Sequence, residues 1–139
     1  MRALTTARHH REVPMGPTHL VSTLVLILIG LALHWRRQPL RHARLMRVAF
    51  LLDLGLVLWL EVSRHAVETA FGGGGGWMLP FHVTVSSLAA IGWGLQLWLG
   101  SRLLRGHKVL RARHIQVGVF FLVMRLANYV TSFFVSGVV

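Results

Sequence analysis

Apolar and polar segments alternate along the chain, and the alternation defines four long apolar stretches. These stretches run over His19–Trp35, Leu45–Val67, Leu79–Leu103 and His114–Val139. A helix needs about 20 apolar residues to cross a hydrocarbon core roughly 30 Å thick. Because each stretch has about that length, the pattern predicts four transmembrane helices. We therefore expect an all-α fold, a transmembrane four-helix bundle.

The chain begins with a short segment of a different kind. Residues 1–17 are polar and basic, and Pro14, Gly16 and Pro17 stand close to the first apolar stretch. We expect this arm to be flexible or to be ordered by a partner. One bundle uses the remaining length, so residues 18–139 are predicted to form a single transmembrane domain.

Composition agrees with a membrane protein and narrows its chemistry. Hydrophobic residues make up 54% of the chain and charged residues 14%, a balance that soluble domains do not favour. The net charge of +11 lies mainly between the apolar stretches, so membrane topology accounts for it and no nucleic-acid partner is expected. The absence of cysteine excludes disulfides, thiolate metal sites and haem attached through cysteine.

The basic residues also predict an orientation. Two loops are rich in arginine and lysine, one after the first apolar stretch and one after the third, whereas the Gly72–Gly76 region between the second and third is poor in them. Short basic loops stay on the cytoplasmic side of a membrane. We therefore expect both basic loops inside, and the glycine run and both termini on the extracytoplasmic side.

Three ionisable residues fall well inside the apolar stretches: Asp53, Glu61 and Arg125. A charge at the middle of a membrane helix costs about 2.5 to 3.5 kcal/mol on insertion scales, so such residues should face the bundle and pair. At about 1.5 Å per residue, Arg125 can reach either acid. We predict a buried ion pair of Arg125 with Asp53 or with Glu61. A cofactor carboxylate and a contact with another subunit are the alternative partners.

Histidines gather near the ends of the stretches and form two layers. In the outer layer, Glu61, His65 and Glu68 share one helical face, since they are spaced i, i+4, i+7, and His82 lies at a similar depth on the next helix. Two imidazoles with carboxylates suit Zn, Fe, Mn or Cu, and the two histidines could instead ligate a haem iron. Solvated helix ends or a surface charge cluster are the alternatives.

The cytoplasmic layer repeats the arrangement with His42 and His107. Paired histidines in two layers of a four-helix bundle are also how transmembrane b-type cytochromes hold two haems. We therefore treat His42 and His107 as candidate ligands of a metal ion or of haem.

Short motifs from residue 42 onward carry a family resemblance. They are His42-Ala-Arg-Leu-Met46, Ala49-Phe50, His65, Pro80-Phe81-His82 and Arg105-Gly106-His107-Lys108 with Arg111. Over roughly residues 40–135 the chain resembles the bacterial four-helix membrane family called domain of unknown function four hundred and twenty. That family includes an assembly factor for haem–copper cytochrome oxidase. The segment Met124–Tyr129, the glycine run and the basic arm depart from its pattern.

The resemblance implies a location and a role. It implies a multi-pass protein of the bacterial inner membrane, with four recurrent histidines that match His42, His65, His82 and His107. It also implies a part in respiratory-chain biogenesis or electron transfer, through copper or haem b.

Three functional hypotheses remain open from the sequence. The first is a metal- or haem-binding membrane protein that serves a respiratory oxidase. The second is an accessory subunit without a cofactor, packed against other membrane subunits of a larger energy-converting complex. The third is a transporter or channel in which Asp53 and Arg125 line a polar path in an oligomer. No catalytic constellation stands out, so we do not expect an enzyme.

Overall fold

The computed structural model describes residues 16–65, 68, 72 and 76–135, and within these ranges all regular secondary structure is helical. The α-helices are α1 (Pro17–His34), α2 (Pro39–Arg64), α4 (Met78–Leu104) and α5 (Arg111–Val135), and a short 3-10 helix, η1 (Lys108–Leu110), precedes α5. The prediction of an all-α fold is confirmed. The predicted arm, apart from Gly16 and Pro17, and residues 73–75 of the glycine run lie outside the described residues.

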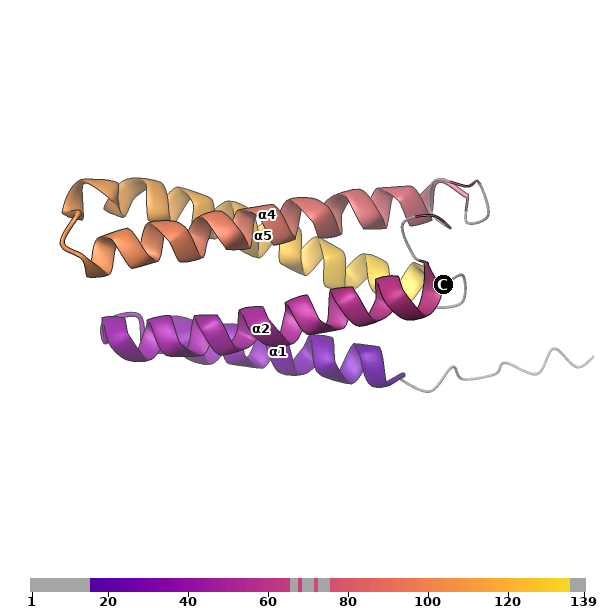
Figure 1. The fold of residues 1–139 in the computed structure, drawn as a ribbon, viewed down its shortest axis with the longest axis horizontal. Helices are drawn as coiled ribbons and strands as arrows, with labels where there is room; N and C mark the ends of the chain where they lie inside the picture. Colours follow the sequence, from indigo (N-terminus) through magenta and orange to yellow (C-terminus); the bar gives the residue numbers. More distant parts are fainter. Residues whose placement is uncertain (1–15, 66–67, 69–71, 73–75, 136–139) are drawn as a thin grey trace, which may run out of the picture.

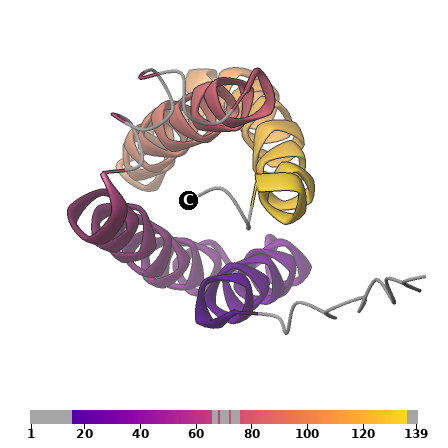
Figure 2. The same cartoon turned by 90° about the vertical axis from the view of Figure 1, so that its right-hand side faces the viewer.

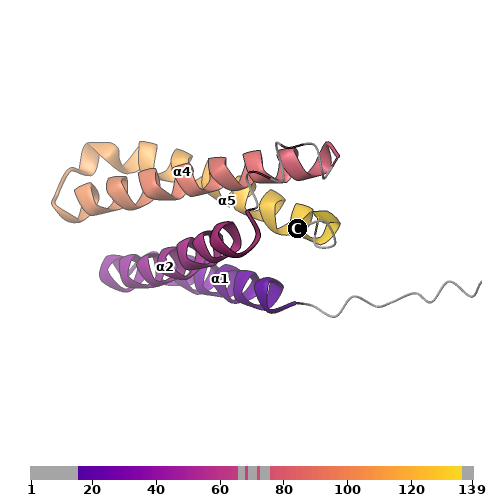
Figure 3. The same cartoon turned by 45° about the vertical axis from the view of Figure 1, so that its right-hand side comes forward.

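The helices form two antiparallel hairpins that lie one over the other. Figure 1 shows α1 beside α2 and α4 beside α5, with α2 and α5 running in the same direction. Seen from the end, the four helices surround a common centre (Figure 2). A turned view separates the α1–α2 layer from the α4–α5 layer (Figure 3). Helix α1 begins and α5 ends at one end of the bundle, and the two basic loops lie at the other.

Local sequence explains where the helices begin and end. Pro17 and Pro39 occupy the first turns of α1 and α2, where a missing N–H costs no helical hydrogen bond. Helix α2 ends because His65 adopts a left-handed conformation (φ 46°) and its N–H bonds to the Glu61 carbonyl at 2.9 Å. Gly106 has φ 95°, a value that glycine adopts without a Cβ clash, and it separates α4 from η1.

Three segments are long and apolar enough to cross a membrane: Pro17–His34, Met78–Leu104 and Lys108–Val135. Helix α2 matches them in length, with 26 residues. Its apolar sequence is interrupted by Arg47, Asp53 and Glu61. A fourth span, and the membrane side on which each end lies, remain predictions.

A small apolar core joins all four helices near the middle of the bundle. It consists of Val25, Ile29 and Ala32 of α1, Met46 and Ala49 of α2, Trp93 of α4 and Phe121 of α5. The Trp93 ring lies 4.7 Å from the Phe121 ring and 5.6 Å from the Phe50 ring, measured between centroids. Large apolar side chains also cover the outside of the helices. Such an exterior is suited to lipid, and it leaves the interior to hold the polar groups.

Candidate functional site

Helices α2 and α5 present matching rows of residues to the interior. On α2 the row is His42, Met46, Ala49 and Asp53, and on α5 it is His114, Gly118, Phe121 and Arg125. Both rows follow the spacing i, i+4, i+7, i+11, which keeps all four residues on one face of the helix. The two helices run in the same direction (Figure 1), and the rows lie in register, since His42 lies beside His114 and Asp53 contacts Arg125. The first and last members therefore form two polar pairs, about 16 Å apart along the bundle.

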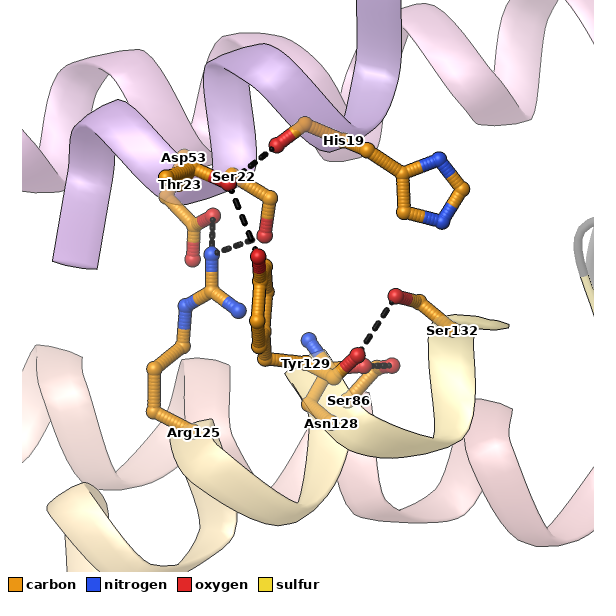
Figure 4. Close-up of polar contacts among 9 residues, drawn as sticks. All are labelled: His19, Ser22, Thr23, Asp53, Ser86, Arg125, Asn128, Tyr129 and Ser132. Carbon is orange, nitrogen blue, oxygen red and sulfur yellow. Dashed lines mark hydrogen bonds and ion pairs between the residues drawn. The ribbon is translucent and has the colours of Figure 1, made fainter. Parts of the chain in front are cut away.

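The deeper pair is an ion pair that joins the two hairpins. Arg125 donates from Nη2 to Asp53 Oδ1 at 2.8 Å and to Ser22 Oγ at 2.9 Å. Figure 4 shows the guanidinium directed at both groups. The Arg125 side chain is 1% exposed and that of Asp53 is 14% exposed. Of the two acids offered by the sequence, Asp53 is thus the one that Arg125 contacts.

Further hydrogen bonds continue from the ion pair toward the end of α5. Thr23 Oγ1 and the Tyr129 hydroxyl lie 2.9 Å apart, and Ser86 Oγ donates to Asn128 Oδ1 at 2.6 Å (Figure 4). One more turn along, His82 Nδ1 lies 2.7 Å from Thr131 Oγ1. These contacts tie α5 to both α1 and α4. In the half of the bundle beyond the ion pair they add to the small apolar cluster of Leu79 and Val135.

The second pair consists of His42 and His114, whose ring centroids lie 6.5 Å apart at an interplanar angle of 84°. His42 Nδ1 lies 2.8 Å from the Ala32 carbonyl oxygen. A carbonyl only accepts, so His42 donates from Nδ1. In the neutral ring this leaves Nε2 with a free lone pair.

Gln96 of α4 supports the other member of this pair. Its Nε2 lies 3.2 Å from His114 Nε2, while Gln96 Oε1 and His114 Nδ1 are buried and have no hydrogen-bond partner among the described residues. Rotating the amide by 180° would let Oε1 accept from a protonated His114 Nε2. His114 Nδ1 would then carry the free lone pair. With the amide in that rotamer, each of the two rings has one hydrogen-bonded nitrogen and one nitrogen with a free lone pair, which in His114 is buried.

The histidine pair lines a cavity of about 900 Å³ at the end of the bundle that carries the basic loops. Its polar lining comprises His42, His114, Gln96, Ser101 and four arginines, Arg36, Arg37, Arg47 and Arg111. Met46, Leu97 and Ile115 contribute apolar wall. No aspartate or glutamate of the described residues lines it. The site can therefore offer imidazole nitrogens to a metal and positive charge to an anion.

The outer histidine layer has a different environment. His65 Nδ1 lies 4.0 Å from Glu68 Oε2, and the two side chains are 74% and 85% exposed. His82 is hydrogen-bonded to Thr131, and Glu61 is half-buried on α2. Over the ranges that the structure describes, no group of three or more His, Asp or Glu side chains is placed to hold a metal ion. A metal site at His65, His82, Glu61 and Glu68 stays a prediction from the sequence.

In the cytoplasmic layer, the structure gives His42 a neighbour other than the one expected. His107 precedes η1, is exposed, and has Nδ1 3.2 Å from the Arg102 carbonyl oxygen. It is absent from the cavity wall, where His114 lies beside His42. The available signal for His114 was its position eleven residues before Arg125. That spacing assigns it to the same interior face.

Comparison with known proteins adds no relative. A scan against protein-family models and searches of curated proteins and of solved structures found no match to this chain.

Proposed function

We propose that this chain is a small multi-pass membrane protein that binds a metal ion or haem through His42 and His114. We propose that the protein either helps to assemble a respiratory oxidase or takes part in electron transfer to that oxidase. The observation that carries the proposal is the pairing of these two imidazoles, from α2 and α5, in a cavity at one end of the bundle. The respiratory role rests on the resemblance of residues 40–135 to the oxidase assembly family.

The chemistry of the two rings fits a ligand role. A histidine that binds a metal usually donates its other ring N–H to a carbonyl or a carboxylate. His42 meets this condition through Ala32, and His114 can meet it through the Gln96 amide. Neutral imidazole suits Cu, Zn and Fe, and two histidines can hold haem iron from opposite faces. Copper or haem, when bound, would supply one-electron chemistry.

The arginines around the cavity extend the fit to a haem. Arg36, Arg37, Arg47 and Arg111 line the same cavity as the two histidines. Guanidinium groups form strong paired hydrogen bonds with carboxylates, so they would hold haem propionates. The apolar wall at Met46, Leu97 and Ile115 matches the apolar face of a porphyrin.

The proposal also includes a membrane arrangement. We take α2 as a fourth span because it lies alongside α1 in the bundle and its Asp53 charge is balanced by Arg125. The basic loops then lie on the cytoplasmic side of a bacterial inner membrane, which puts the cavity at that face and both termini outside.

A second function is favoured by a different observation. His42, His82 and His107 each have one ring nitrogen within hydrogen-bond distance of a protein oxygen. Such contacts also suit histidines that only hold the bundle together. The protein would then be an accessory subunit without a cofactor, bound to other membrane subunits of a larger complex.

One experiment separates the two functions. The protein is extracted in mild detergent without chelators, and its metal content and absorption spectrum are measured. The double variant His42→Ala/His114→Ala should lose the metal or the haem band, while His34→Ala and His107→Ala, both at exposed positions, should keep it. A wild-type protein with neither metal nor haem, migrating with a large complex on native gels, would establish the accessory role instead.

A second measurement tests the respiratory role. Cells that lack the gene should assemble less active cytochrome oxidase, and wild-type protein should restore it. Restoration by the His42→Ala/His114→Ala variant would show that the histidines are not needed for that role.

A further inference from the structure

The arginines of the cavity carry an inference that does not depend on a cofactor at the histidines. We infer that, in protein whose cavity holds no haem propionates, Arg36, Arg37, Arg47 and Arg111 bind the phosphate head group of an anionic membrane phospholipid, with the two-phosphate lipid cardiolipin as the best match.

The four positive charges come from separate parts of the chain and meet at one cavity. Arg36 and Arg37 belong to the α1–α2 connection, Arg47 lies on α2, and Arg111 begins α5. None of the described acidic side chains lines the cavity to balance them. Like charges gathered in one place repel one another, and an anion bound among them relieves that repulsion. The arrangement therefore favours a ligand with more than one negative charge.

The type of residue points to phosphate. The guanidinium of arginine is planar and always charged, and it binds the oxygens of a phosphate through two parallel hydrogen bonds. Four arginines can serve two phosphates with two guanidinium groups each. All four side chains are exposed as well as cavity-lining, so a head group can reach them without opening the core.

The cavity wall indicates that the ligand is a lipid. Beside the arginines, the wall contains Met46, Leu97, Leu104 and Ile115, which would contact the apolar part of an amphipathic molecule. The cavity is lined by residues where α1 and α4 end and α2 and α5 begin, at the end of the bundle that carries the two basic loops (Figure 1). For helices that cross a membrane, this is the level of the lipid head groups.

A neighbouring contact supports the position of the cavity at the level of the lipid head groups. Arg102 stacks on the Trp98 ring, with its Cζ atom 5.4 Å from the ring centroid, on the last turns of α4. Tryptophan and arginine concentrate at membrane interfaces. Basic pockets between transmembrane helices on the cytoplasmic side are known to bind cardiolipin-type head groups.

The test uses the full chain, purified in mild detergent and stripped of lipid. Binding of cardiolipin, of phosphatidylcholine and of inorganic phosphate is measured by native mass spectrometry and by the shift in unfolding temperature. The variant Arg36→Gln/Arg37→Gln/Arg47→Gln/Arg111→Gln removes the charges of the cavity. Its control, Arg41→Gln/Arg44→Gln/Arg105→Gln/Arg113→Gln, removes the same charge from exposed arginines near the same end that do not line the cavity.

We expect cardiolipin to bind the wild type and the control, and to bind the cavity variant at least about tenfold more weakly. Equal losses in the two variants would mean a nonspecific charge effect and would overturn the inference. So would unhindered binding to the cavity variant, or inorganic phosphate that binds as tightly as cardiolipin. If the fourfold variants do not fold, Arg36→Gln/Arg37→Gln and Arg41→Gln/Arg44→Gln give the same comparison.

The histidine variant keeps this inference apart from the proposed cofactor. His42→Ala/His114→Ala should still bind cardiolipin, since the arginines remain. Wild-type protein without metal or haem that binds cardiolipin at the arginines would reject the cofactor and support the lipid site. Conversely, a metal or haem content that depends on the histidines, in a protein that does not bind cardiolipin, would support the cofactor and reject the lipid site.

Discussion

Arg125 donates to Asp53 over 2.8 Å across the interior of the bundle, from α5 of one hairpin to α2 of the other. The same guanidinium reaches Ser22 of α1 at 2.9 Å, so this one α5 side chain contacts both helices of the other hairpin, α1 and α2. The apolar core cluster, which also joins the two hairpins, lies mainly between the ion pair and the histidine cavity. The ion pair therefore adds a polar connection between the hairpins beyond that core.

The first prediction concerns the loss of this charge. Arg125→Leu leaves the Asp53 carboxylate buried without its partner, a change that costs about 3 to 5 kcal/mol in buried ion pairs. We expect a large fall in unfolding temperature in detergent and poor accumulation in membranes. Thermal unfolding followed by circular dichroism measures the effect.

Two further variants define the cause of that effect. Arg113→Leu removes an exposed arginine from the same helix and should unfold near the wild-type temperature. The double variant Asp53→Leu/Arg125→Leu removes both charges and should recover much of the stability lost in Arg125→Leu. A double variant as unstable as the single one would show that the ion pair is not the source of the loss.

The sequence located this ion pair because charges inside apolar stretches must be paired. It could not choose between Asp53 and Glu61, since a long arginine side chain reaches either depth and rotation about the helix axis decides the contact. The structure resolves that rotation through the row His42, Met46, Ala49 and Asp53.

The candidate site was harder to foresee for a similar reason. The sequence singled out His107, but the left-handed Gly106 and the turn of η1 put His107 before the start of α5. Its side chain is thereby removed from the interior row. His114 does belong to that row. From the sequence, only its spacing of eleven residues from Arg125 indicates this, because a single histidine near a helix end is usually exposed to solvent. The four apolar stretches, in contrast, follow from length and hydropathy alone.

The second prediction concerns two glycines that differ in surroundings. A Cβ at Gly118 would lie 2.8 Å from Gln96 Nε2, whereas a Cβ at Gly30 would meet nothing within 4 Å. Gly118→Ala should push the Gln96 amide away from His114 and weaken cofactor retention. Gly30→Ala should be neutral or should stabilise α1 by roughly 0.5 to 1 kcal/mol. Unfolding temperature and cofactor content are compared for both variants. Equal behaviour of the two would contradict the role given to Gln96.

The third prediction addresses the polar contact between α1 and α5. Thr23 Oγ1 and the Tyr129 hydroxyl lie 2.9 Å apart, and such a bond contributes about 0.5 to 1.5 kcal/mol. Tyr129→Phe and Thr23→Val should each destabilise the protein by an amount in that range. The double variant should cost less than the sum of the two single variants, because both remove the same bond. Strict additivity in a double-mutant cycle would show that the two side chains do not interact in the membrane.

The last prediction tests the role of His65, which the sequence proposed as a ligand. His65 adopts φ 46° and ψ 48° at the end of α2, a conformation that costs roughly 1 to 2 kcal/mol for residues other than glycine. His65→Gly removes that cost and is expected to raise the unfolding temperature, whereas His65→Ala retains it. If His65 instead binds a metal with His82, both variants should lose metal and unfold earlier than the metal-loaded wild type. The direction of the shift for His65→Gly therefore decides whether this histidine ends a helix or holds an ion.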